Sequence, residues 1–212
     1  VKPGAVQTAV KDEVPISKIQ APPDSQHGIG IVLFHREHIG PLRLKAQRIK
    51  IPQNAVLDCG ESGSTLRFLL PVCCALGSIA GTPEDFTVSL VGHGRLPERP
   101  LSPLYEELAA HGAILSPIGA NPLVVRGKLT AGDYSLDGGV SSQFISGLLF
   151  ALPLLGGDST LSVTGKIESV PYIHMTTDAI SRVTGAVGGD LPRYSIKGRN
   201  SRPAIPFDGG AS

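Results

Sequence analysis

Cysteine is scarce in this sequence, which argues against a protein stabilised by disulfides or by a zinc site. The 212 residues contain Cys59, Cys73 and Cys74. An odd number of cysteines without metal-ligand spacing is not a disulfide framework, and the six histidines show no zinc-ligand spacing either. Cys73 and Cys74 lie in an apolar run and are expected to be small core residues. The sequence therefore indicates a reducing compartment, the cytoplasm, and no bound metal.

Excess charge and long apolar runs are also lacking. Nineteen basic and 18 acidic residues give a formal net charge of +1, which argues against a nucleic-acid partner. No apolar run approaches the roughly 20 residues of a membrane span, so we expect no membrane partner. The sequence has no Walker-type loop and no dinucleotide fingerprint, and no serine with a nearby base indicates a nucleophile. We therefore expect no cofactor.

Apolar residues, glycine and proline are plentiful. Hydrophobic residues make up 41% of the chain, and there are 26 glycines and 18 prolines. This composition, with charges well mixed, is typical of a folded core with many tight turns and not of a disordered chain.

An internal repeat organises the chain. Its copies read LDCGES at 57–62, LDGGVS at 136–141 and FDGGAS at 207–212, so they lie 79 and 71 residues apart. Further pairs keep the same order, such as TVSLVG at 87–92 and TLSVTG at 160–165. Self-similarity at a fixed period is the signature of a fold built from repeated units.

Each unit predicts the same order of elements, β-α-β-α-β-β. An apolar helix follows the first turn, a strand rich in β-branched residues comes next, and a second helix begins at a proline and ends at a glycine. Two short strands close the unit. The expected first helices are 64–76 and 141–154, the strands 86–91 and 160–164, and the second helices open at Pro100 and Pro171 and end at Gly112 and Gly185.

The domain organisation follows from these units. Residues 41–212 are expected to form one substrate-binding domain, with complete units at 58–136 and 137–208. Residues 42–46 are an earlier partial copy, and 1–40 fit no unit, although 27–34 read as one strand. The chain thus begins near the end of one unit and stops as another opens, which indicates a piece of a larger repeat protein.

Two loops in the first unit combine glycine with basic side chains. Residues 60–67 read GESGSTLR, in which glycines allow close backbone approach and a helix start attracts anions. Alone, this stretch is more typical of an ordinary N-cap and a buried helix. Residues 94–100 read GRLPERP, whose two arginines can clamp a phosphate or form a solvated pair with Glu98.

Two loops in the second unit place hydroxyl groups at helix starts. Residues 137–144 read DGGVSSQF, a pattern that suits a phosphate and also a capping box. Residues 169–172 read SVPY, in which Ser169 can cap a helix and Tyr172 can pack in a core. Equivalent junctions of a repeat fold gather at one end of the structure. Together, the four loops predict a positive pocket for a small dianion.

These four motifs, in this order and at these distances, resemble 5-enolpyruvylshikimate-3-phosphate (EPSP) synthases, the 3-phosphoshikimate 1-carboxyvinyltransferases. The resemblance runs from about Pro41 to Ser212 and covers most of the N-terminal domain of such enzymes. The stretch at 137–144 is the most specific element, and the arginine loop at 95–100 is next. The related UDP-N-acetylglucosamine enolpyruvyl transferases share the fold, but their substrate motifs differ.

The resemblance implies an α/β (α+β) fold and a transferase activity. Family members have two domains of three β-α-β-α-β-β units each, with helices inside and sheets outside. They join the 5-hydroxyl of shikimate 3-phosphate to the enolpyruvyl group of phosphoenolpyruvate, through a tetrahedral intermediate that loses phosphate, in the biosynthesis of aromatic amino acids. The reaction needs no metal.

The resemblance also implies two sets of site residues, and no catalytic residue in this chain. The set for shikimate 3-phosphate is Ser141, Ser142, Gln143, Ser169 and Tyr172. The set for phosphoenolpyruvate, which is also the glyphosate site, is Gly63, Arg99, Gln143, Arg95 and Arg67.

The chain departs from the family in three ways. Only residues 21–26 echo the family's N-terminal Pro-x-Ser-Lys-Ser stretch, and its lysine is missing. Glu61 stands where many members have asparagine, and the whole second domain is absent. We therefore expect the isolated chain to be an inactive half of the enzyme. The alternatives are a non-catalytic module that binds a phosphorylated ligand or a protein, and a structural repeat domain without a small-molecule site.

Overall fold

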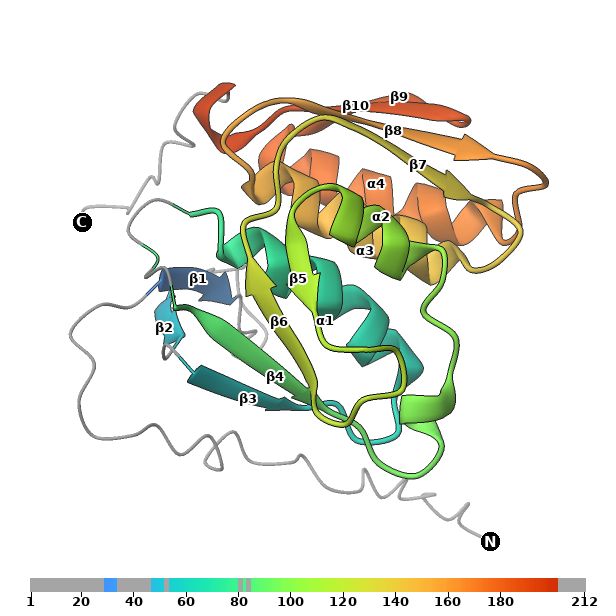
Figure 1. Cartoon of the computed structure of the whole chain (residues 1–212). Helices are drawn as coiled ribbons and strands as arrows, with labels where there is room; N and C mark the ends of the chain where they lie inside the picture. Colours follow the sequence, from blue (N-terminus) through green and yellow to red (C-terminus); the bar gives the residue numbers. More distant parts are fainter. Residues whose placement is uncertain (1–28, 34–46, 52–53, 80–81, 83–84, 202–212) are drawn as a thin grey trace, which may run out of the picture.

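The computed structural model describes residues 29–33, 47–51, 54–79, 82 and 85–201 (Figure 1). The expected third motif copy at 207–212, the partial copy at 42–46 and most of the segment 1–40 lie outside these residues. β1 (Ile29–Leu33) and β2 (Gln47–Ile51) form an antiparallel pair. β1 lies within the strand expected at 27–34.

Residues 54–127, called unit one below, form a four-stranded sheet and two helices. The sheet has the order β3-β4-β6-β5, in which β3 and β4 are parallel and the other pairs are antiparallel. The elements in chain order are β3 (Asn54–Asp58), α1 (Gly63–Leu76), β4 (Thr87–Val91), the 3-10 turn η2 (Leu96–Glu98), α2 (Leu104–Ala110), β5 (Ala113–Leu115) and β6 (Leu123–Gly127).

Residues 133–196, called unit two below, repeat this arrangement. The sheet has the order β7-β8-β10-β9, again with only its first two strands parallel. The elements are β7 (Asp133–Asp137), α3 (Ser142–Ala151), η3 (Leu152–Leu154), β8 (Ser159–Thr164), α4 (Val170–Thr184), β9 (Val187–Asp190) and β10 (Arg193–Ile196), and η4 (Arg199–Ser201) follows. The expected β-α-β-α-β-β order is therefore confirmed for both units.

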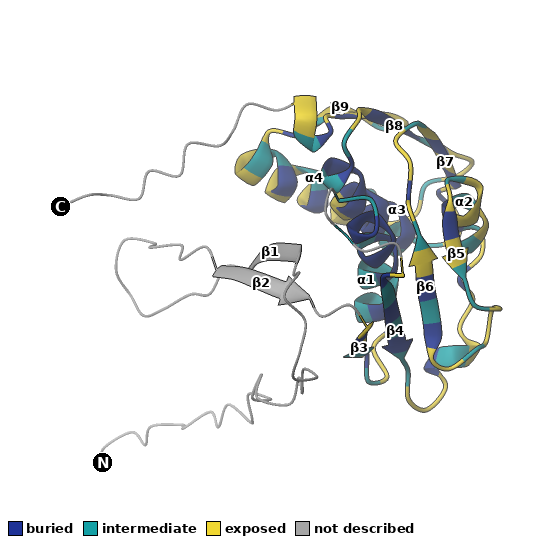
Figure 2. Cartoon of the chain, turned by 60° about the vertical axis from the view of Figure 1, so that its left-hand side comes forward, coloured by how far each residue is buried: buried dark blue, intermediate teal, exposed yellow. Residues whose placement is uncertain are grey.

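The core lies between the two sheets, where the helices pack (Figures 1 and 2). α1 packs directly on α3, and α3 packs on α4. Gly147 makes the first contact close, because a β-carbon there would lie 2.5 Å from the carbonyl oxygen of Arg67. Strands bury alternate residues, as in β7, where Tyr134 and Leu136 are buried and their neighbours are exposed. The fold class expected from the sequence, with helices inside and sheets outside, is confirmed.

The second helix of each unit, α2 in unit one and α4 in unit two, differs in length and in where it begins. α4 contains Pro171 in its first turn and ends at Gly185 in the left-handed conformation, as expected. α2 begins at Leu104, four residues later than the start predicted at Pro100. The reason is Pro103, which lacks the N–H that a helix beginning at Pro100 would need at that position.

The short helix α2 also joins the two units, because it packs on β7. The Glu107 carboxylate accepts a hydrogen bond of 2.7 Å from the backbone N–H of Ser135. The His111 ring stacks on the Tyr134 ring with centroids 3.7 Å apart. Within the described residues, no helix has the length and apolar character needed to cross a membrane.

Candidate functional site

The loops that precede the helices lie at the carboxyl ends of parallel strands. In unit one, the loop after β3 leads to α1 and the loop after β4 leads to η2. Backbone bonds join these loops, from Cys59 N to the Val91 oxygen at 2.8 Å and from His93 N to the Gly60 oxygen at 2.7 Å. Ser62 caps α1, since its hydroxyl accepts from the Thr65 N–H. The helix start and the arginine loop are thereby held side by side.

Arg99 lies directly against Gly63. A β-carbon built on Gly63 would lie 2.8 Å from Nη1 of Arg99, so a larger residue would displace the guanidinium. Gly63 is buried, whereas the Arg99 side chain is exposed. The glycine in the 60–67 motif therefore makes room for an arginine that comes from a different loop.

Arg67 and Gln143 bridge the two units. Arg67 Nη1 donates to Gln143 Oε1 at 2.9 Å, and Gln143 Nε2 donates to the Ser64 hydroxyl at 2.6 Å. The Arg67 guanidinium also lies 5.2 Å from the centroid of the Phe144 ring, a cation–π distance. Burial, and then the nearby charge of Arg99, lower the pKa of Arg67. Two cationic side chains thus face one region beside the start of α1.

The loops of unit two are also joined by two backbone hydrogen bonds, of which the first is equivalent to that in unit one and the second involves different positions. Gly138 N donates to the Thr164 oxygen at 2.9 Å, and Glu168 N donates to the Gly138 oxygen at 3.1 Å. Ser141 caps α3 by accepting from the Gln143 N–H at 3.3 Å, so Ser142 is the first residue of that helix. The starts of α3 and α4 are therefore tied together at the base of their loops.

Ser169 and Tyr172 do not have the ordinary structural roles that their motif allowed. Ser169 makes no side-chain capping bond, and among the described residues it is the one non-glycine with a positive φ, of 55°. Such a backbone is sparsely populated and costs about 1–3 kcal/mol. The Tyr172 side chain is not in the core but 38% exposed. Both residues are available to a ligand at the start of α4.

Arg95 is exposed and paired with Glu98, which is not a member of this group. Its side chain is 91% exposed, and its Nε lies 3.6 Å from a carboxylate oxygen of Glu98. The turn η2 lies between Arg95 and Arg99 and gives the two arginines different surroundings. The structure thus brings together Gly63, Arg67, Arg99 and Gln143, with Ser141 and Ser142 adjacent, and leaves Arg95 outside.

Two members of the group were missed by sequence reasoning. The Ser64 hydroxyl accepts from Gln143, and the Pro100 carbonyl oxygen accepts from Arg67 Nη2 at 3.3 Å. Ser64 lies inside the 60–67 motif, so its position was a signal that could have been used. A backbone carbonyl leaves no signal in the sequence.

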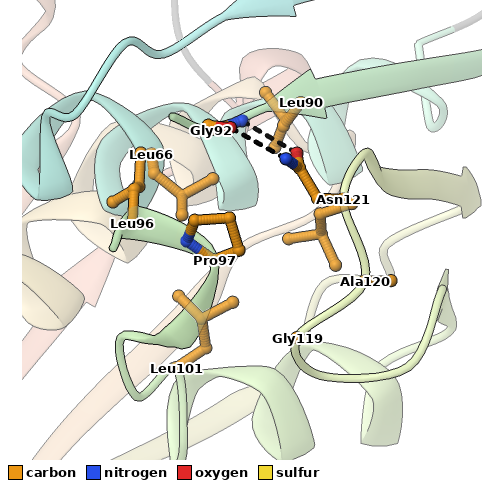
Figure 3. A pocket seen from close by; sticks show the side chains of 10 residues that line it. Leu66, Leu90, Gly92, Leu96, Pro97, Leu101, Gly119, Ala120 and Asn121 are labelled. Atoms are coloured by element: carbon orange, nitrogen blue, oxygen red, sulfur yellow. Dashed lines mark hydrogen bonds between the residues drawn. The ribbon is translucent and has the colours of Figure 1, made fainter. Parts of the chain in front are cut away.

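A small apolar pocket lies behind η2 and is separate from this group (Figure 3). Leu96 and Pro97 line it from one side, and the loop with Ala120 lines it from the other. The Asn121 amide bonds both the N–H and the carbonyl of Gly92, which fixes that loop (Figure 3). None of the predicted site residues lines the pocket.

The described residues contain no group of three or more histidine, cysteine, aspartate or glutamate side chains that could hold a metal. Cys59, Cys73 and Cys74 are free and buried. Burial raises the pKa of the Cys59 thiol to about 11 and that of Cys73 to about 12. All three thiols are core residues and are not nucleophiles, and for Cys73 and Cys74 this confirms the prediction from the sequence.

Several known proteins similar to this chain share one description. A family model described as EPSP synthase (3-phosphoshikimate 1-carboxyvinyltransferase) matches residues 37–208. A 3-phosphoshikimate 1-carboxyvinyltransferase of Clostridium kluyveri is 42% identical over 147 residues, which cover 68% of this chain and 33% of the relative. The enzyme of the same description from Clostridium botulinum, strain Alaska E43, is 34% identical over 194 residues, which cover 89% of this chain and 43% of the relative. The chain thus spans less than half the length of these relatives.

A solved structure agrees at the level of fold. The EPSP synthase of Acinetobacter baumannii aligns with a TM-score of 0.53 at 23% identity, covering 72% of this chain and 32% of that one. At that identity the likeness concerns the arrangement of elements alone.

Proposed function

Because the chain belongs to the EPSP synthase family, we propose that it carries part of a substrate site for shikimate 3-phosphate and phosphoenolpyruvate. One observation carries the proposal: Arg67 and Arg99 converge beside a helix start, and Gln143 spans from unit two to the same place. Among the residues that the structure describes, neither guanidinium has a carboxylate partner. Uncompensated guanidinium groups at a helix N-terminus favour a phosphate or carboxylate.

The hydroxyl groups of unit two hold the phosphate of shikimate 3-phosphate in this proposal. Ser142 and Ser169 supply hydroxyl donors, the capping Ser141 completes the loop, and Tyr172 lies against the sugar-acid ring. The positive φ of Ser169 supports this assignment, because such a backbone is retained where function requires it.

The arginines of unit one hold phosphoenolpyruvate in this proposal. Arg99 and Arg67 bind its anionic groups, Gly63 keeps the backbone close, and Gln143 lies between the two substrates. Arg95, which is exposed and paired with Glu98, attracts anions from the rim.

We propose that the whole protein catalyses transfer of the enolpyruvyl group to the 5-hydroxyl of shikimate 3-phosphate, with release of phosphate. The arginines would stabilise the negative charge that develops in the tetrahedral intermediate. The relatives' greater length supports a second domain that supplies the remaining groups, which makes this chain alone a half-site without turnover. Three free buried thiols support a reducing location, the cytoplasm.

A second candidate is a module that binds a phosphorylated ligand without catalysis. The observation that favours it is the stretch APPDSQ at 21–26, which lacks the lysine of the family motif. Both candidates bind shikimate 3-phosphate, but only the transferase releases phosphate from phosphoenolpyruvate when a second domain from a relative is added.

Calorimetric titration of the purified chain with shikimate 3-phosphate, and then with phosphoenolpyruvate, tests the proposal. Loss of one charge-assisted hydrogen bond costs about 1.5–3 kcal/mol, so we expect Arg99→Ala to weaken phosphoenolpyruvate binding roughly 10- to 100-fold. Ser142→Ala should weaken shikimate 3-phosphate binding in the same direction. Arg182→Ala, on the exposed face of α4, is the matched control and should bind as the unaltered chain does. Absence of binding to the unaltered chain at millimolar ligand contradicts the proposal.

A further inference from the structure

An exposed histidine–carboxylate contact joins the two loops that carry Gly63 and Arg99. Asp58 is the last residue of β3, and His93 follows the end of β4 by two residues. The His93 Nε2 atom lies 3.0 Å from Oδ1 and 3.1 Å from Oδ2 of Asp58. The pair therefore connects two segments that are 35 residues apart in sequence but lead to the two halves of the proposed anion site.

Asp58 also holds the turn that begins the first loop. Its Oδ1 accepts from the Gly60 N–H at 2.8 Å, while the Gly60 carbonyl oxygen accepts from His93 N at 2.7 Å. The hydrogen bond from Gly60, and then that from His93, lower the pKa of Asp58. Side chain and backbone thus form a closed ring of bonds around Asp58, Gly60 and His93.

Unit two lacks this side-chain pair at the matching place. Asp137 corresponds to Asp58 and makes the same turn bond, since its Oδ1 accepts from the Gly139 N–H at 2.7 Å. Lys166 corresponds to His93, but its Nζ lies 2.9 Å from Glu168 instead. The pair therefore does not follow from the repeat itself. It occurs in the unit whose loop carries Arg99.

We propose that Asp58 and His93 are positioning residues that set the separation of the two loops and so hold Arg99 against Gly63. The inference rests on the proposed function, because it assigns the pair a role in the affinity of that site. The facing charges on the same loops are Glu61, whose carboxylate lies against Gly94, and Arg95 with Glu98. Asp58 and His93 do not touch the substrate in this proposal. They act through the placement of Arg99.

The expected loss of phosphoenolpyruvate binding is small because the side chains of Asp58 and His93 are exposed to solvent. The His93 and Asp58 side chains are 55% and 66% exposed, and pairs of this kind contribute little in free energy. We expect His93→Ala and Asp58→Ala each to weaken phosphoenolpyruvate binding about 2- to 5-fold. The double variant should bind no more weakly than Asp58→Ala alone, because Asp58→Ala already removes the interaction with His93 together with the Gly60 turn bond.

Calorimetric titration of the chain with phosphoenolpyruvate is the test, with a conservative variant and a matched control. His93→Gln retains an N–H donor toward Asp58, so it should restore binding to within about 2-fold of the unaltered chain. His174→Ala breaks a similar exposed pair, with His174 Nε2 3.1 Å from Asp190, which lies within unit two and does not join the loops that carry Gly63 and Arg99. It should leave binding unchanged. Far-UV circular dichroism checks that each variant is folded.

The outcomes separate this inference from the proposed function. If Arg99→Ala weakens binding but His93→Ala does not, the pair has no positioning role and the site stands. Equal losses in His93→Ala and His174→Ala, or no recovery in His93→Gln, also overturn the inference. Failure of the unaltered chain to bind phosphoenolpyruvate overturns both.

Discussion

Unit one and unit two have the same backbone plan but place equivalent residues in different surroundings. In each, five residues of the first strand pair in parallel with the next strand, Asn54–Asp58 with β4 and Asp133–Asp137 with β8. Yet Leu136 is 1% exposed, whereas its counterpart Leu57 is only partly buried. The difference arises because α2 packs on β7, and among the described residues no helix of a preceding unit packs on β3.

The second helices show the same dependence on neighbours. α2 has seven residues and lies against β7, whereas α4 has 15 residues and carries the exposed side chains of Tyr172, Met175 and Val183. The comparison teaches that the repeated sequence specifies each unit's internal order, while the adjacent unit decides which faces are buried. A unit of this fold cannot bury its whole apolar surface alone.

The largest expected difference between the units is in the leucine that precedes each turn. Leu136→Ala should lower the free energy of unfolding by about 2–5 kcal/mol, as is usual for a fully buried leucine. Leu57→Ala should cost only roughly 1–2 kcal/mol, because part of that side chain already contacts water. Urea unfolding of both variants measures the difference. Equal losses would mean that α2 does not protect β7.

A smaller effect is expected where the units meet. In Gly147→Ala the new methyl group would meet the Arg67 carbonyl oxygen at 2.5 Å and Cγ of Pro71 at 3.0 Å, so α1 and α3 must move apart. Such overpacking costs about 1–3 kcal/mol and would also lengthen the bond from Arg67 to Gln143. Thermal unfolding and phosphoenolpyruvate titration check both effects. Gly132→Ala, which meets only the His111 ring at 3.8 Å, is the control and should change neither.

The smallest expected effect concerns the ion pair between Asp158 of unit two and Lys197, the residue that directly follows this unit. Lys197 Nζ lies 2.6 Å from Asp158, and this bond is the main reason that the pKa of Asp158 falls from 3.8 to about 2. A carboxyl group whose pKa is lowered by folding stabilises the folded state at pH values above its ordinary pKa. This stabilisation is therefore present above pH 3.8 and is lost as the pH falls toward 2. Asp158→Asn should remove that part of the pH dependence of the melting temperature.

A matched variant in unit one sharpens this last test. The corresponding residues are Asp85 and Arg126, which form no such pair in the described part of the chain. Asp85→Asn should therefore leave the decrease of the melting temperature at low pH the same as in the unaltered chain. If the melting temperature at low pH changes equally in both variants, the effect does not come from the pair of Asp158 and Lys197.

Local signals in the sequence predicted the order of elements well. The repeated turn motifs, the proline that opens α4 and the glycine that ends it each act through the nearest few residues. The start of α2 was predicted wrongly because Pro100 and Pro103 are both possible helix openers, and only a start after Pro103 needs no N–H from that proline. The domain boundaries at 40 and 41 lie in a part of the chain that the structure does not describe.

The candidate site was less accessible to sequence reasoning. Gly63, Arg67, Arg99 and Gln143 were selected by motif, but the contacts between them depend on how two loops and two helices meet. Arg95 and Arg99 look alike in the sequence, and only the turn η2 between them separates one from the other. The pair of Asp58 and His93 was not predicted, since partners 35 residues apart have no local signal.

The bridge from Gln143 to Ser64 and Arg67 limits how such a chain can be recombined. Each unit contributes atoms that the other unit's side chains need, so a chimaera that takes unit one from one homologue and unit two from another inherits two halves of one hydrogen-bond network. Both halves can fold correctly and still leave the Gln143 amide without its acceptor. Crossovers between 127 and 133 should therefore be paired with checks on these three residues, although that linker is the natural place to cut.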